Sequence, residues 1–150
     1  MADGLTRIAA DPASFIPTHL VHPELLLAGS PGDRGVTLFE SADGSLKCGV
    51  WACDTYSERL PSYPEDELYV VVEGSVVVTV DGEGPQTFGP GDALVIQQGT
   101  ACTLEFRGPF RKVFMTHDGT ARPVRDEPRS PAASFSRVTD GGADDGSADG

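Results

Sequence analysis

The sequence predicts an all-β fold of the sandwich or jelly-roll type, and three observations indicate it. About eight short runs rich in valine and aromatic residues have the length of strands. Glycine-containing turns separate most of these runs, and no segment repeats its apolar residues with a helical period. The chain has 150 residues, which suits one domain with a substantial core and would make a second domain cramped.

Residues 1–35 are expected to form an N-terminal arm without long regular structure. Four prolines and several glycines fall in this stretch, and both residue types interrupt helices and strands. Short pieces around Phe15 and residues 24–27 could still pack. The triplet Leu25-Leu26-Leu27 is apolar enough to need cover, either from the sheet or from a neighbouring subunit.

Two β-hairpins are predicted after the arm. The first joins strands at residues 36–40 and 46–53 through a turn at Asp43-Gly44. The second joins residues 68–72 and 75–80 through Glu73-Gly74, because glycine can take the positive φ that a two-residue turn usually requires.

The remaining strands are short and are followed by a segment of different composition. Strands are predicted at residues 56–63, 86–88, 93–96, 102–106 and 110–116, with Pro61 confining the first of them to an edge or a bulge. Residues 118–150 are expected to form a flexible acidic tail. The last twelve of them, residues 139–150, contain four aspartates and no large apolar side chain, so they cannot bury enough surface to offset their loss of entropy.

Charge and cysteine content exclude several classes of function. The formal net charge of −12 argues against nucleic acid or an anionic membrane as a partner, because both are bound through basic patches. No run approaches the ~20 apolar residues that a membrane span needs, and the N-terminus lacks the apolar segment of a secretory signal. Three cysteines, Cys48, Cys53 and Cys102, form no CxxC pair, which favours reduced thiols in the cytoplasm.

Three consecutive acids open the strand that begins near residue 68. Alternation along an extended strand sends Glu65, Glu67 and Tyr69 to one face and Asp66 to the other. One of these faces must be the core, so at least one carboxylate is expected to point inward at the mouth of the strand. This is the main hint of function in the sequence.

Several motifs resemble those of the cupin superfamily. Glu67 and Gly74, which are separated by six residues, resemble the end of the first cupin motif, and residues 91–99, GDALVIQQG, resemble the second. The glycine-x-tryptophan that ends at Trp51, the turn FGPGDA at residues 88–93 and the closing arginine-lysine strand are similar to the branch that contains (S)-ureidoglycine aminohydrolase and the ethanolamine-utilisation protein EutQ. The resemblance covers roughly residues 36–117, the expected cupin domain, and implies a jelly-roll barrel.

The sequence departs from the metal-binding pattern that this resemblance implies. Metal-binding cupins supply two histidines just before the glutamate, and the corresponding residues 60–64 contain none. The third histidine would align with Cys102, while His19, His22 and His117 lie elsewhere in the chain. One carboxylate and one thiol are too few ligands for a first-row metal, so no metal or other cofactor is expected.

Glu67 has two interpretations. Inside an apolar barrel, its pKa would be raised by desolvation and by the neighbouring Glu65, so that the pair could transfer a proton near neutral pH, assisted by Tyr63 or Tyr69. Alternatively, Glu67 accepts hydrogen bonds from the backbone or from a tyrosine and only stabilises the strand, while Glu65 is solvated.

The other candidate site residues also have structural alternatives. Trp51 could stack on a ligand or could fill the core with its N–H satisfied. Cys102 could face a pocket or could be a small core residue, and Gln97 could orient a polar ligand at the barrel mouth or be an ordinary turn residue. Of Arg111 and Lys112, one must face inward or into an interface, and an inward cation beside Glu67 would form an ion pair that abolishes a general-base role.

Two classes of function therefore remain open. The first is a metal-independent cupin that binds a small polar molecule in its barrel. The second is a small-molecule enzyme, a hydrolase or lyase similar to the ureidoglycine aminohydrolases, that uses Glu67 with Tyr63, Glu65 or Tyr69. The exposed edge strands and the apolar arm favour a homodimer in either case.

Overall fold

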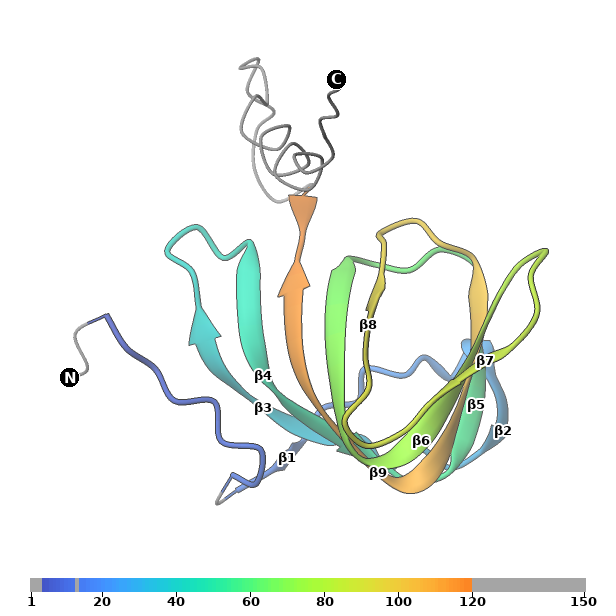
Figure 1. Ribbon diagram of the computed structural model, residues 1–150, viewed down its shortest axis with the longest axis horizontal. Helices are drawn as coiled ribbons and strands as arrows, with labels where there is room; N and C mark the ends of the chain where they lie inside the picture. The colour runs from blue at the N-terminus through green and yellow to red at the C-terminus, as the bar shows by residue number, and fades with distance from the viewer. Residues whose placement is uncertain (1–3, 13, 120–150) are drawn as a thin grey trace, which may run out of the picture.

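The computed structural model describes residues 4–12 and 14–119, and these residues form a single curled β-sheet (Figure 1). The prediction of an all-β fold is confirmed. The elements are β1 (Ile16–Pro17), the 3₁₀ helix η1 (Pro23–Leu25), β2 (Leu26–Gly29), β3 (Arg34–Glu40), β4 (Leu46–Cys53), β5 (Tyr56–Leu60), β6 (Asp66–Val80), β7 (Gln86–Phe88), β8 (Ala93–Ile96) and β9 (Cys102–His117).

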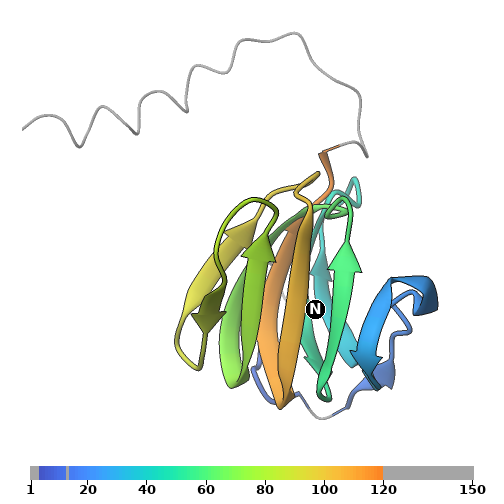
Figure 2. The same cartoon turned by 90° about the vertical axis from the view of Figure 1, so that its right-hand side faces the viewer.

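The sheet is organised around β6 and β9, which run antiparallel to each other over nearly their whole length. The C-terminal half of β9 also pairs with β4, and the N-terminal half of β6 pairs with β8, so one wall has the strand order β3-β4-β9-β6-β8. The other halves form the second wall, β2-β5-β9-β6-β7, which faces the viewer in Figure 2. The sheet therefore folds over on itself, and the two walls enclose the core.

The predicted hairpin at Glu73-Gly74 is wrong. Residues 66–80 form one strand, and residues 102–117 likewise form one strand where two were expected. Gly74 does adopt a positive φ of 76°, but it produces an irregularity in the β6–β9 pairing and no chain reversal. A Cβ at this position would lie 2.5 Å from the carbonyl oxygen of Pro109, so glycine permits the close approach of the two strands where the sheet bends.

Most other predicted strands are confirmed. The segments at 36–40, 46–53, 86–88 and 93–96 correspond to β3, β4, β7 and β8, and β5 ends at Leu60, directly before Pro61. In the first 35 residues, β1 pairs with β3 and β2 pairs with β5, so this stretch adds a strand to each wall. Of the expected acidic tail, residues 120–150 lie outside the described part of the chain.

The core lies between the walls and is rich in aromatic residues. Tyr69, Phe106 and Phe110 are almost completely buried. The rings of Phe106 and Phe110 meet edge to face with 4.9 Å between their centroids, and Tyr56 stacks on Phe106 at 5.0 Å. Each such side chain contributes roughly 1.5–3 kcal/mol by its removal from water, so this cluster stabilises the fold substantially.

Candidate functional site

Four polar side chains meet inside the curled sheet, and we call them the Glu67 cluster: Tyr63, Glu67, Tyr69 and Lys112. The hydroxyl of Tyr63 donates a hydrogen bond to Oε1 of Glu67 at 2.7 Å, and the Nζ atom of Lys112 donates to Oε2 at 2.6 Å. Glu67 lies on β6 between β8 and β9, where strand alternation directs it and Tyr69 to the same inner face. Both carboxylate oxygens of Glu67 therefore have a partner.

Lys112 is the cation that faces inward, and Arg111 faces the other way. The side chain of Lys112 is 7% exposed and that of Glu67 is 12% exposed. The Nζ atom also lies 3.5 Å from the ring centroid of Tyr69, whose electron-rich face attracts a cation. Burial lowers the pKa of Lys112, and the neighbouring Glu67 opposes this shift. Arg111 instead pairs with Asp11 at 2.9 Å and with Glu73 at 3.4 Å.

The two tyrosines extend the cluster into a chain of hydrogen bonds. Their hydroxyl oxygens are 2.7 Å apart. Burial raises the pKa of both phenols well above the ordinary value, and the nearby Glu67 carboxylate adds to the shift, so both stay protonated. Because a phenol has one proton and Tyr63 gives its own to Glu67, Tyr69 donates to Tyr63.

Trp51 lies against this cluster and has a donor without an acceptor. It pairs with Lys112 across β4 and β9, and its ring centroid is 4.8 Å from the Nζ atom. The side chain is buried, as expected for a core residue, but Nε1 has no hydrogen-bond partner in the described part of the chain. A buried N–H without an acceptor is uncommon and is a point where a ligand oxygen or a water could bind.

A second buried acid, Glu58, was not identified from the sequence. Its Oε2 atom accepts a hydrogen bond from the hydroxyl of Tyr56 at 3.1 Å, and burial raises its pKa. The hydrogen bond from Tyr56 and the positive charge of Lys112 oppose this shift. The alternation of Tyr56 and Glu58 along β5 was the available signal, because it places both side chains on the inner face.

The remaining predicted site residues occupy different surroundings. Glu65 is half-buried, and its pKa is raised first by burial and then by the charge of Glu67. Cys102 is completely buried in the core, where burial raises the pKa of its thiol. Gln97 is exposed beyond the end of β8, and it lines a cavity.

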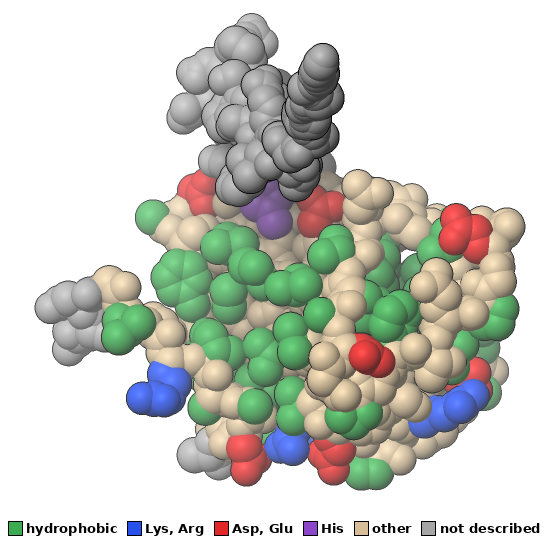
Figure 3. All heavy atoms as spheres, viewed as in Figure 1, with side chains coloured by type: hydrophobic (Ala, Val, Ile, Leu, Met, Phe, Trp, Pro, Cys, Tyr) green, Lys and Arg blue, Asp and Glu red, His purple; other side chains and the backbone are tan. Residues whose placement is uncertain are grey.

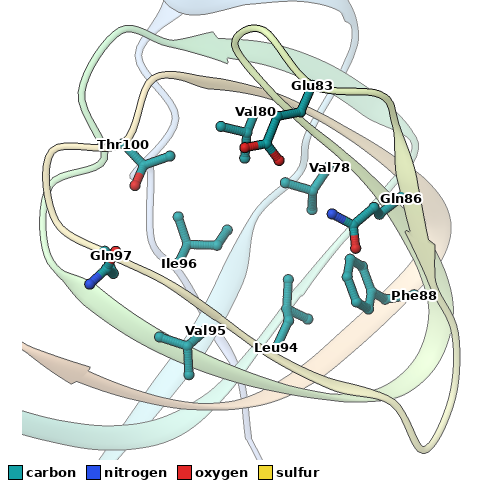
Figure 4. A pocket seen from close by; sticks show the side chains of 10 residues that line it. All are labelled: Val78, Val80, Glu83, Gln86, Phe88, Leu94, Val95, Ile96, Gln97 and Thr100. Atoms are coloured by element: carbon teal, nitrogen blue, oxygen red, sulfur yellow. The ribbon is translucent and has the colours of Figure 1, made fainter.

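This cavity has a volume of about 430 Å³ and opens between β6, β7 and β8 (Figure 4). Its lining combines apolar side chains with polar side chains from β7 and the adjoining turns, as Figure 4 shows. The apolar wall includes Val78, Val80, Phe88, Leu94 and Ile96, and the polar residues are Glu83, Gln86, Gln97 and Thr100.

The cavity adjoins the Glu67 cluster. Ile96 pairs with Glu67 across β8 and β6, and the backbone N–H of Tyr63 donates to the carbonyl of Thr100 at 2.8 Å. A small molecule in the cavity would therefore be one strand away from the buried polar groups.

The donor set does not fit a metal ion. In the described residues, no group of three or more His, Cys, Asp and Glu side chains is arranged to hold one. His117 is paired with Asp66 at 3.9 Å, and Asp66 alternates with Glu67 and so belongs to the opposite face of the sheet.

The comparisons with known proteins agree with this architecture. The sequence model of the EutQ-like cupin domain family matches residues 40–114. A Pseudomonas syringae protein of unknown function has a similar structure, with 28% identity, a TM-score of 0.65 and coverage of 69% of this chain but only 44% of the other. The Clostridium difficile EutQ protein is 20% identical with a TM-score of 0.48, over 59% of this chain and 70% of that one.

One eukaryotic structure is also similar, and the search of curated proteins found nothing. The cupin domain of Schizosaccharomyces pombe Cnp3 is 16% identical with a TM-score of 0.50, over 63% of this chain and 69% of that one. At such identity the similarity concerns the fold alone. No curated protein matches the sequence significantly. The described residues contain no helix with the length and apolar character that crossing a membrane requires.

Proposed function

This chain belongs to the EutQ-like cupin domain family, and on that premise we propose that it binds a small polar molecule in its barrel without a tightly bound metal. The observation that carries the proposal is the Glu67 cluster, a set of oriented polar groups in the interior, one strand away from a cavity that Ile96, the pairing partner of Glu67, lines. Buried polar groups that are held by one another keep a fixed geometry, which lowers the entropy cost of binding.

The unpartnered N–H of Trp51 supports a ligand with a hydrogen-bond acceptor. The ammonium of Lys112 lies 4.8 Å from the centroid of the Trp51 ring, so the same part of the interior offers a second group that favours a ligand oxygen. The apolar cavity wall would accommodate the rest of a small molecule, since binding pockets combine mostly apolar walls with a few placed polar groups.

The metal-free part of the proposal rests on the partners of Glu67. Tyr63 and Lys112 each donate a hydrogen bond to one carboxylate oxygen of Glu67, so a metal ion at either oxygen would have to compete with a donor that is already in place. The ammonium of Lys112 would also repel a metal cation at this position. Cys102 cannot contribute easily, because its buried thiol stays protonated at neutral pH.

A second candidate function is the hydrolase or lyase in which Glu67 acts as general acid or base. The hydrogen-bond chain from Tyr69 through Tyr63 to Glu67 supports it, as does the raised pKa of Glu65. The ion pair with Lys112 disfavours it, because a carboxylate stabilised as an anion by an ammonium is a weak base. We therefore place binding before catalysis.

A thermal-shift screen of small polar molecules, followed by turnover assays on each hit, separates the two functions. We expect binding without turnover, with affinity reduced in Trp51→Phe and Glu67→Gln. Glu105→Gln is the matched control, because Glu105 is exposed on β9 away from the cavity. Conversion of a hit that disappears in Glu67→Gln would establish the enzyme and refute the binding proposal.

Elemental analysis of the purified protein tests the metal-free part independently. One equivalent of iron, zinc or manganese per chain would contradict it. The same conclusion would follow if added manganese or zinc restored turnover of a screened compound.

A further inference from the structure

The cavity between β6, β7 and β8 carries charge of one sign only. Among the described residues that line it, Glu83 is the one with a formal charge, and no Lys, Arg or His is present. Glu83 lies in the turn between β6 and β7. The other polar side chains are neutral, and they are Gln86, Gln97 and Thr100. The cavity therefore offers hydrogen-bond acceptors and one negative charge beside its apolar wall.

The Glu83 carboxylate is not neutralised by another side chain. Within the described ranges it forms no hydrogen bond and no ion pair. Asp81, in the same turn, differs, because Arg59 donates to both of its carboxylate oxygens at 2.6 and 2.8 Å. Figure 4 shows the Glu83 carboxylate turned toward the space that the lining residues surround, with Thr100 on one side and Gln86 on the other. Both oxygens of Glu83 are therefore open to a ligand.

The end of the barrel that holds the cavity is acidic as a whole. Figure 3 shows acidic side chains along the upper end of the molecule, where the turns after β6 and β8 lie, and the visible Lys and Arg side chains in the lower half of the view. Asp66 accepts a hydrogen bond at 2.8 Å from the backbone N–H of Gln98, which follows a lining residue in the chain. The pKa of Glu65 is raised by burial and then by the charges of Glu67 and Asp118. In a chain of net charge −12, this end attracts cations.

We propose that the molecule bound in this cavity is an organic cation, with an ammonium group on a short apolar chain. The inference rests on the proposed function and specifies its ligand. An ammonium has three N–H donors, and the carboxylate of Glu83, the amide carbonyl of Gln86 and the hydroxyl of Thr100 are three acceptors. The cavity of about 430 Å³ has the size of a small-molecule site, and its apolar wall accommodates the chain.

The same groups disfavour ligands of other charge. An anion would be repelled by Glu83 and would find no cation in the lining that the structure describes. A neutral alcohol would contact the same wall but would lose the stronger hydrogen bond that forms between two ions. Charge, more than shape, is therefore expected to determine which small molecule binds.

NMR titration of the full chain with pentylammonium, pentan-1-ol and pentanoate at neutral pH tests this order. The probes share one pentyl chain and differ in charge. Pentylammonium should bind about tenfold more tightly than pentan-1-ol, and pentanoate should bind most weakly. The chemical-shift changes should be largest at Val78, Leu94 and Ile96, which line the cavity.

Substitutions at Glu83 identify the group that recognises the cation. Glu83→Gln keeps the size of the side chain and should weaken pentylammonium binding about tenfold while leaving pentan-1-ol unchanged. Glu83→Lys should make pentanoate the preferred probe. The control is Glu105→Gln, which removes the same charge from an exposed position on β9 and should alter affinity by less than about twofold. A general attraction of cations to an acidic protein would respond equally to both Glu→Gln variants.

Three results would overturn the inference: pentan-1-ol or pentanoate binding as tightly as pentylammonium, equal responses to Glu83→Gln and Glu105→Gln, or no binding by any of the probes. The proposed function would survive each of them if the wider thermal-shift screen found a neutral or anionic ligand whose affinity depends on Trp51 and Glu67. A screen without any hit would instead refute the proposed function itself.

Discussion

The Nζ atom of Lys112 lies 2.6 Å from Oε2 of Glu67, and both side chains are enclosed by the curled sheet. Removing two charges from water is costly, so the pair is stable only because each ion has further partners. Glu67 also accepts the hydroxyl proton of Tyr63, and Lys112 lies over the ring of Tyr69. The cluster is therefore a single unit in which the loss of one member leaves another unsatisfied.

Replacement of Lys112 alone should destabilise the protein strongly. Lys112→Met keeps the apolar part of the side chain but leaves the Glu67 carboxylate buried without its counter-ion, which should cost about 3–5 kcal/mol. The double variant Lys112→Met/Glu67→Gln removes both charges and should recover most of this loss, since the amide can still accept from Tyr63. Urea denaturation of the wild type and the variants measures these differences. If the double variant is as unstable as the single one, the ion pair is not the reason for the loss.

The two tyrosines should differ in importance although they contact each other. Tyr63→Phe removes the donor to Glu67 and the acceptor of Tyr69, so it should cost about 1–3 kcal/mol. Tyr69→Phe removes one hydrogen bond and should cost about 1 kcal/mol. Both substitutions delete one oxygen from a buried ring, so each serves as the size-matched control for the other. Equal losses in urea denaturation would contradict the assignment of two hydrogen bonds to the hydroxyl of Tyr63 and one to that of Tyr69.

Local sequence patterns predicted much of the fold, because strand alternation and turn formation depend on residues that are neighbours in the sequence. Alternation placed Glu67 and Tyr69 on one face, and turn residues gave the bounds of β4 and β8. It failed at Glu73-Gly74, where a glycine with positive φ fits both a hairpin turn and an irregular strand. The choice between them depends on β9, which is distant in sequence and pairs with both halves of β6.

The candidate site was predictable only in part, for the same reason. The inward Glu67 followed from alternation and from the cupin resemblance. The choice between Arg111 and Lys112 did not, because the sequence was interpreted as two separate strands there. In the continuous β9, the alternation that buries Cys102, Leu104, Phe106 and Phe110 also directs Lys112 inward. Glu58 was overlooked because a lone acid in a short strand is usually solvated, and only the assembled walls bury it.

Glu58 should make stability depend on pH. Burial raises its pKa above the ordinary value of 4.5, so between that value and the raised one the folded protein binds more protons than the unfolded chain. The contribution of protonated Glu58 to the free energy of unfolding is fully present below the pKa of the unfolded chain. It is lost as pH rises through the pKa of the folded protein. Glu58→Gln removes this dependence and can still accept from Tyr56, so its stability relative to the wild type should increase from acidic to neutral pH.

Urea denaturation at several pH values measures the effect of Glu58→Gln. Glu105→Gln is the control, because the same change at an exposed carboxylate on β9 should leave the difference from the wild type nearly constant. A difference for Glu58→Gln that stays constant or decreases with rising pH would show that the carboxyl is not held protonated by its surroundings.

Alanine substitutions at Gly74 and Gly82 separate two effects of an added Cβ. One is the strain of a positive φ, and the other is the clash between β6 and β9 where the sheet bends. The φ angles of the two glycines are 76° and 84°, so alanine at either position should cost about 1–2 kcal/mol of backbone strain. At Gly82 nothing lies within 4 Å of an added Cβ, whereas at Gly74 the carbonyl oxygens of Pro109 and Arg107 lie at 2.5 and 2.6 Å. Gly74→Ala must therefore also push β6 away from β9, and we expect it to cost at least about 2 kcal/mol more than Gly82→Ala in urea denaturation. Equal losses would mean that the two strands can separate at the bend without penalty, and that the close approach at Gly74 does not determine how the sheet folds over.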